Sequence, residues 1–143
     1  MPKEISEEKK GELSRIALEA QSAQQQGANI QNQIASLQSS IIEIRATMET
    51  LKNIREVRGG DVLLPIGAGV FVNAKIAGGD RALVEIGGNI ITEKSAAEAT
   101  EILEKRLKVV EETRERLQSA LAELDQRLRE LDAEAKRILA KSE

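Results

Sequence analysis

Residues 61–94 read DVLLPIGAGVFVNAKIAGGDRALVEIGGNIITEK, and this stretch decides the fold because it separates two long segments of a different kind. It is rich in Val, Ile and Leu, shows no helical period and is divided by glycine-containing turns. On either side, apolar or small residues recur at alternating steps of three and four over about six heptads. Such a period keeps one apolar stripe facing a partner helix, which is typical of a coiled coil. The pattern predicts helix, small β body, helix.

The first heptad segment predicts a coiled-coil helix within residues 6–58. We expect it to begin between Ser6 and Leu13 and to end near Val57 to Arg58, because a Gly-Gly pair follows. The stripe that would face the second helix consists of Leu13, Ile16, Ala20, Ala23, Gly27, Ile30, Ile34, Leu37, Ile41, Ile44, Met48 and Leu51.

The second heptad segment predicts a helix over residues 95–141. Ser95 and Glu98 have the spacing of a capping box, which satisfies backbone N–H groups at a helix start. The middle segment brings the chain back, so the helices are expected to pair antiparallel, with Leu51 near Leu103 and Leu13 near Ile138. The second stripe consists of Ala96, Leu103, Leu107, Val110, Leu117, Leu121, Leu124, Leu128, Leu131, Ala135 and Ile138, interrupted only by Thr100 and Arg114.

Two parts of the stripes depart from ordinary coiled-coil packing. The Gln-rich stretch 20–32 fills its stripe with Ala, Ala and Gly, which predicts a thin, loosely packed zone or a functional hinge. Arg114 is expected either to pack its stem and reach water with its head, or to form a buried ion pair that fixes the register. The outer face of the second helix predicts acid-to-base pairs four residues apart, at Glu101–Lys105, Glu104–Lys108, Glu112–Arg116, Glu123–Arg127 and Asp132–Lys136.

The middle segment divides at its turn signals into four short strands, near 62–66, 70–76, 82–86 and 90–93. Two hairpins result, and four such strands bury too little apolar area to stand alone and leave exposed edges. We therefore expect them to pair with strands of other chains. The side chains predicted to carry this assembly are Val62, Leu64, Ile66, Val70, Val72, Ile76, Val84, Ile86 and Ile90.

These elements define an α+β fold, in which a long antiparallel coiled-coil helical hairpin carries two central β-hairpins. The chain is expected to be a single domain of residues 1–143, with the helices at 6–58 and 95–141 and the assembly body at 61–94. Because a hairpin of helices buries only one stripe per helix, the chain has little core of its own, which also indicates oligomerisation.

Composition excludes several classes of function. The 21 basic and 24 acidic residues give a formal net charge of −3, and Phe71 is the only aromatic residue, so a nucleic-acid partner is not expected. The chain lacks His and Cys, which removes the usual nucleophile–base pairs and most zinc sites. The glycines of 67–69 do not fit a nucleotide-binding fingerprint. We expect no enzyme activity and no cofactor. Without an apolar run of membrane-spanning length or a signal peptide, no membrane partner and a cytoplasmic location are expected.

The order of elements and two sequence stretches resemble the archaeal prefoldin alpha subunit. These stretches are VLLPIGAGVFV at 62–72 and VEIGGNI at 84–90, flanked by the two helices. The resemblance covers nearly the whole chain, and its two hairpins fit the alpha type, since beta-type subunits carry one. It implies that the hairpins join an oligomeric β-barrel body, in a hexamer of two alpha and four beta-type subunits from which six coiled coils project.

The resemblance also implies a function. The family captures non-native proteins at the coiled-coil tips and delivers them to a group II chaperonin, without ATP or metal. The side chains expected to contact clients at the tip of this subunit are Leu13, Ile16, Leu18, Leu131, Ile138 and Leu139, of which Leu18 and Leu139 lie off the stripe. The alternatives are that these residues simply close the coiled coil, and that the chain is a filament-forming or scaffolding protein assembled through its β segment.

Overall fold

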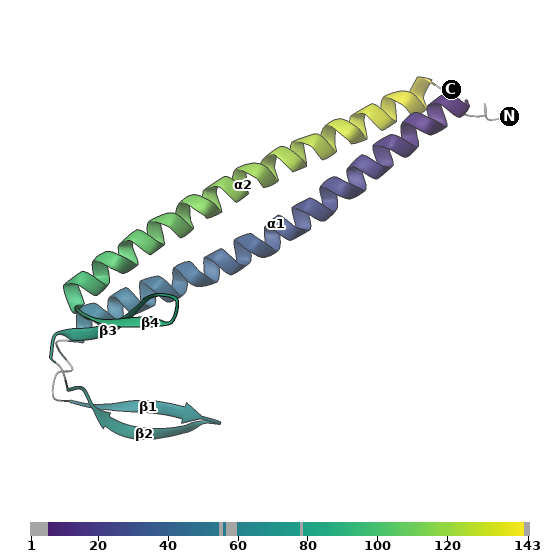
Figure 1. Cartoon of the computed structure of the whole chain (residues 1–143). Helices are drawn as coiled ribbons and strands as arrows, with labels where there is room; N and C mark the ends of the chain where they lie inside the picture. Colours follow the sequence, from purple (N-terminus) through teal and green to yellow (C-terminus); the bar gives the residue numbers. More distant parts are fainter. Residues whose placement is uncertain (1–5, 55, 57–59, 78, 142–143) are drawn as a thin grey trace. The chain divides into compact units, whose positions relative to one another are not determined.

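The computed structural model describes residues 6–54, 56, 60–77 and 79–141. Two long helices flank two antiparallel β-hairpins in the sequence, which confirms the predicted fold class. The hairpins form no closed barrel within the described part of the single chain. The order of elements is α1 (Glu7–Asn53), β1 (Asp61–Gly67), β2 (Val70–Lys75), β3 (Arg81–Gly87), β4 (Ile90–Ser95) and α2 (Ala96–Lys141) (Figure 1).

The described residues fall into two compact units. One consists of residues 6–38 and 112–141, and the other of residues 39–111. Each unit contains a segment of α1 and a segment of α2, and the second also contains both hairpins. The assignment of residues 1–143 to a single domain stays a prediction.

The starts of both helices are capped by serine. The Ser6 hydroxyl accepts a hydrogen bond from the Lys9 N–H at 3.2 Å, and α1 begins at Glu7, within the predicted range. At α2, the Ser95 hydroxyl accepts a hydrogen bond from the Glu98 N–H at 3.1 Å. The Glu98 carboxylate lies 3.1 Å from the same hydroxyl, so it supports the cap instead of reaching a backbone N–H.

The end of α1 differs from the sequence prediction. The helix ends at Asn53, where the Asn53 carbonyl accepts a hydrogen bond from the Glu56 N–H at 2.9 Å. This three-residue spacing tightens the chain into a final turn, so the expected end near 57–58 is too late. Residues 57–59, including the first glycine of the predicted stop, lie outside the described residues.

Most buried side chains of the two helices follow the predicted stripes, but Ala99 of α2 is 1% exposed and lies outside the predicted stripe. In the unit of residues 6–38 and 112–141 they include Ile16, Ile34 and Leu131. In the unit of residues 39–111 they include Ile41, which is 2% exposed, and Ala96. Arg114 also lies partly buried on the stripe, and its buried Nε has no hydrogen-bond partner in the described structure. Of the two alternatives for Arg114, the buried ion pair is not observed among the described residues.

We call the line along which the two stripes face each other the seam. It is thin where the stripe of α1 carries only small residues, as predicted. Ala23 and Gly27 are buried, and a hollow beside them is lined by Leu121, Leu124 and Leu128 of α2. A Cβ added at Gly27 would lie 3.6 Å from the Leu121 Cδ1, which is ordinary van der Waals contact. Alanine therefore fits at this position, whereas a longer side chain would meet Leu121.

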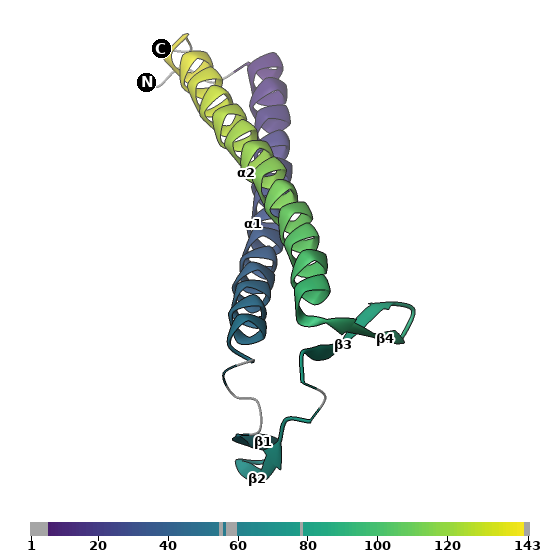
Figure 2. The ribbon, with the colours of Figure 1, turned by 90° about the vertical axis from the view of Figure 1, so that its left-hand side faces the viewer.

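The hairpins β1–β2 and β3–β4, which are labelled in Figure 2, have the same pairing pattern and turn geometry. Each has a register irregularity just before its turn, between Pro65 and Gly67 in the first hairpin and between Glu85 and Gly87 in the second. Both turns have two central residues with positive φ, which is the type I′ geometry that suits the twist of a hairpin. In the described structure, β1 pairs only with β2 and β3 only with β4.

We predict that Gly27→Ala stabilises the chain by about 1 kcal/mol, because glycine is a poor helix former and the added methyl group has room beside Leu121. Thermal and denaturant unfolding of matched preparations would measure the change. Gly27→Leu is the control, since its longer side chain would collide with Leu121 and lower stability. A loss of stability in the alanine variant would contradict the packing described here.

Candidate functional site

The N-terminal turns of α1, residues 7–20, and the C-terminal turns of α2, residues 127–141, form what we call the arm end. A network of charged side chains joins the two helices there. Arg127 Nε donates to Glu19 Oε1 at 2.8 Å, and Arg15 Nη2 donates to Glu134 Oε1 at 3.2 Å. Within α1, Arg15 Nη1 lies 3.5 Å from Glu19 Oε2, and within α2, Arg127 Nη1 lies 3.3 Å from Glu130 Oε2. Two cross-helix links therefore hold the arm end closed.

The six predicted client-binding residues separate into two groups at the arm end. Ile16 and Leu131 are 4% and 1% exposed, so both are enclosed in the seam, while Leu13 and Ile138 are partly buried beside them. Leu18 is 68% exposed and Leu139 is 44% exposed. Of the six residues, the two off-stripe leucines are therefore the ones exposed to solvent.

The charge network perturbs the titration of its members. The hydrogen bond from Arg127 lowers the pKa of Glu19, and the positive charges of Arg127 and Arg15 lower that pKa further, against an opposing effect of desolvation. The hydrogen bonds to Glu19 and Glu130 raise the pKa of Arg127. Both charges of the pair are therefore favoured in the folded arm.

Apolar side chains are exposed on both hairpins. Of the residues predicted to carry assembly, six are exposed and Val62, Ile76 and Val84 are partly buried; the exposed ones are Leu64, Ile66, Val70, Val72, Ile86 and Ile90. The sequence prediction missed the exposed Leu63, Phe71, Leu83 and Ile91. The signal was available, because apolar residues stand side by side in these strands and alternation must place them on opposite faces.

The second hairpin is attached to the start of α2. The Ala96 N–H donates to the Asp80 carbonyl at 2.8 Å, and the Arg106 guanidinium donates to the Glu85 carbonyl. On the paired strands, Arg81 Nε lies 3.4 Å from Glu93 Oε1, which forms an ion pair. Ala82, Val84, Thr92 and Lys94 alternate along these strands and are all partly buried, whereas Leu83 on the opposite face is 75% exposed. The outward face of the hairpin, with Leu83 and Ile91, is thus exposed in the single chain.

Comparison with known proteins identifies the family. The family model Prefoldin, described as "Prefoldin subunit", matches residues 23–141. The chain belongs to the prefoldin family.

The prefoldin relatives are alpha subunits. The prefoldin subunit alpha of Pyrococcus horikoshii is 34% identical over 132 residues, which cover 91% of this chain and 89% of that protein. The prefoldin subunit alpha of Thermofilum pendens is 36% identical over 120 residues, covering 83% of this chain and 93% of that protein. These matches place the chain among the alpha subunits of a chaperone family, as the sequence resemblance predicted.

A solved prefoldin structure shares the fold. The cryo-electron microscopy structure of filamentous PFD from Methanocaldococcus jannaschii is similar with a TM-score of 0.73 and 29% sequence identity. The match covers 83% of this chain and 99% of that chain.

No helix within the described residues combines the length and apolar composition that crossing a membrane requires.

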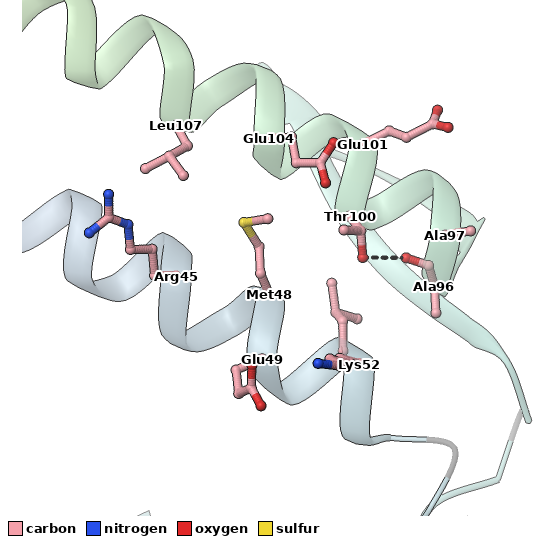
Figure 3. Close-up of a pocket in the computed structure, with 11 residues that line it drawn as sticks. Arg45, Met48, Glu49, Lys52, Ala96, Ala97, Thr100, Glu101, Glu104 and Leu107 are labelled. Atoms are coloured by element: carbon pink, nitrogen blue, oxygen red, sulfur yellow. Dashed lines mark hydrogen bonds between the residues drawn. The ribbon is translucent and has the colours of Figure 1, made fainter.

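An open groove lies between the helix segments next to the hairpins of this prefoldin chain (Figure 3). Small residues of α2, Ala96, Ala97 and Thr100, leave room opposite Met48 and Leu51 of α1. The Thr100 hydroxyl is engaged, since it donates to the Ala96 carbonyl at 2.8 Å. The described residues contain no cluster of acidic side chains suited to hold a metal ion. Charged side chains also line the groove, at Arg45, Glu49, Lys52, Glu101 and Glu104.

We predict that the stabilising effect of Glu19 depends on pH. Because its pKa is lowered on folding, its contribution is fully present above the unfolded-state pKa and is lost as the pH falls through the folded-state pKa. Wild type should unfold at a higher temperature than Glu19→Gln at pH 7, and the difference should vanish at a pH below the folded-state value. An equal difference at both pH values would contradict the pairing with Arg127.

Proposed function

We propose that this prefoldin alpha subunit acts as an ATP-independent holdase in the cytoplasm. It captures non-native proteins at its arm end and passes them to a group II chaperonin, as part of a hexamer of two alpha and four beta-type subunits. The family match supports the chaperone role. The exposure of Leu18 and Leu139 at the arm end is the observation that supports the capture surface.

Exposed leucines suit the chemistry of such clients. A non-native chain displays apolar segments, and burying them against another apolar surface yields about 25 cal/mol per Å². Two leucines on one arm give only weak binding, but several arms contacting one client would raise the overall affinity without new contacts. Weak individual contacts also allow release, which transfer to a second chaperone requires.

The hairpins are proposed to hold the hexamer together. Their exposed apolar side chains and unpaired strand edges fit the β-barrel body that the resemblance implies, in which strands of other subunits cover both. The proposed capture surface and the assembly surface lie in different segments of the chain, so each is open to separate mutation.

We predict that Leu18→Ser with Leu139→Ser reduces the suppression of client aggregation by about twofold or more, because the arm end loses its exposed apolar contacts. The matched control is Ile42→Ser, since Ile42 is 69% exposed, nearly the same as Leu18, but lies on the other compact unit. Light scattering of a denatured client measures the outcome. Equal suppression by the double variant and wild type, with hexamer mass unchanged, would refute capture at this arm end.

We predict that Val72→Asp or Val84→Asp dissociates the hexamer and leaves the helices folded. Val72 lies in the exposed surface that assembly would cover, and Val84 lies on the partly buried face of the second hairpin, where an unpaired charge would disturb the hairpin itself. Asn89→Asp is the control, since it adds the same carboxylate at a turn residue whose φ of 61° both Asn and Asp tolerate. Native mass spectrometry and circular dichroism report assembly and helix content. An intact hexamer in both valine variants would refute the proposed body.

A filament-forming or scaffolding role is the second candidate. It is favoured by the similarity to a subunit from a structure titled filamentous PFD. Electron microscopy of the purified chain, alone and with a beta-type subunit, separates the two roles. Long fibres without the partner support the second candidate, and discrete particles formed with the partner support the first.

A further inference from the structure

The charge network of the arm end differs from ordinary surface ion pairs because it joins the two helices. Glu19 reaches across to Arg127, and Arg15 reaches across to Glu134, at 2.8 and 3.2 Å. Their side chains are 35–56% exposed, so the surrounding protein shields them partly from solvent. A network of this kind contributes more than an isolated surface pair, since each arginine meets two carboxylates.

The network lies where the apolar seam is weakest. On α1, the stripe positions that follow Ile16 are Ala20, Ala23 and Gly27, which bury few apolar atoms. Ile16 and Leu131 are the buried side chains of this end, and a thin part of the stripe follows Ile16 on α1. The two cross-helix ion pairs add to the apolar packing of Ile16 and Leu131 there.

We propose that Glu19 and Arg127 act as positioning residues that set how much apolar surface this arm offers to a client. While the two cross-helix links hold, Ile16 and Leu131 stay enclosed and only Leu18 and Leu139 are accessible. When the links open, the end turns separate and add Ile16 and Leu131 to the capture surface. This inference rests on the proposed holdase function and deepens it, because the partner is an extended apolar segment of a non-native chain.

Ile16 and Leu131 are well suited to enlarge the capture surface when the arm end opens. Ile16 and Leu131 are 4% and 1% exposed, so separating the helices would expose almost their whole side chains. Helix ends open locally at lower free energy than the rest of a structure, and opening at the arm end need not disturb the remainder of the seam. Client binding would favour the open state, because it buries the two side chains again.

The test compares variants of the network in the assembled hexamer. Glu19→Gln and Arg127→Gln each remove the same cross-helix link; the first keeps the side-chain size, and the second also shortens the side chain. The first control is Asp132→Asn, which breaks a 3.0 Å ion pair with Lys136 within α2 in the same unit. The second is Glu111→Gln, which breaks the 2.8 Å cross-helix pair with Arg45 in the other unit. A fifth variant inverts all five charges of the network, at Arg15, Glu19, Arg127, Glu130 and Glu134, and so keeps every attraction.

Two measurements are made on each hexamer, amide hydrogen exchange and the suppression of client aggregation. Glu19→Gln and Arg127→Gln should speed exchange in peptides around Ile16 and Leu131 by about twofold to fivefold, and should increase suppression per hexamer. Both controls should leave exchange at the arm end unchanged, and the inverted network should restore wild-type behaviour. Salt at about 1 M should speed exchange more in wild type than in Glu19→Gln, because the variant keeps only the Arg15–Glu134 link for salt to screen.

Each other outcome overturns the inference in a recognisable way. Unchanged exchange in Glu19→Gln and Arg127→Gln would show that the network does not hold the arm end, whatever the chaperone activity. Faster exchange with unchanged or weaker suppression would show that Ile16 and Leu131 do not serve clients. A wild-type hexamer that fails to suppress aggregation of any client would overturn the proposed function itself, and this inference with it.

Discussion

The exposed apolar side chains of the β-hairpins impose the main constraint on this molecule. Two separate two-stranded sheets fall below the size that is stable alone in water, and their apolar residues lie on both faces. The second hairpin has one face partly covered and still presents Leu83 and Ile91 outward. A surface of this kind fits the proposed assembly, in which strands from other chains would cover it and complete the fold of the single subunit.

The helices meet a different requirement. They bury a single stripe and pair along it, and the stripe is thin where α1 carries Ala23 and Gly27. Electrostatic links between the helices supplement the packing at the arm end, through Glu19 and Arg127. A capture surface must be apolar enough to bind non-native chains but small enough to keep the free chaperone soluble. Enclosing Ile16 and Leu131 while exposing Leu18 and Leu139 would satisfy both demands.

Much of the fold follows from the sequence, because its signals are local and periodic. The alternation of three and four placed the buried stripes correctly, and the glycine turns located both hairpins. The end of α1 was placed too late, because the prediction relied on the Gly-Gly pair at residues 59–60 whereas the helix ends at Asn53. The turn that ends the helix is made by a backbone hydrogen bond, which no side-chain pattern reports.

The charge network of the arm end was not predictable from the sequence. The spacing pairs Glu123 with Arg127, yet Arg127 bonds to Glu19 and Glu130. Only Asp132 with Lys136, among the five pairs predicted on α2, corresponds to an ion pair observed between the described residues. A cross-helix partner depends on the register between two helices distant in sequence, which the heptads specify only as a repeating stripe. The stripe did separate the apolar residues of the arm end, since Leu18 and Leu139 lie off it and are exposed, whereas Ile16 and Leu131 lie on it and are buried.

The most direct test of this account measures amide hydrogen exchange in the four strands, with the subunit as a monomer and then in complex with a beta-type subunit. The account predicts that β1 to β4 exchange rapidly in the monomer and become strongly protected in the complex, while the seam around Ile34 and Ile41 stays protected in both. Native mass spectrometry of the same samples confirms which species is measured. Strands that are equally protected in the monomer would contradict the claim that other chains complete this fold.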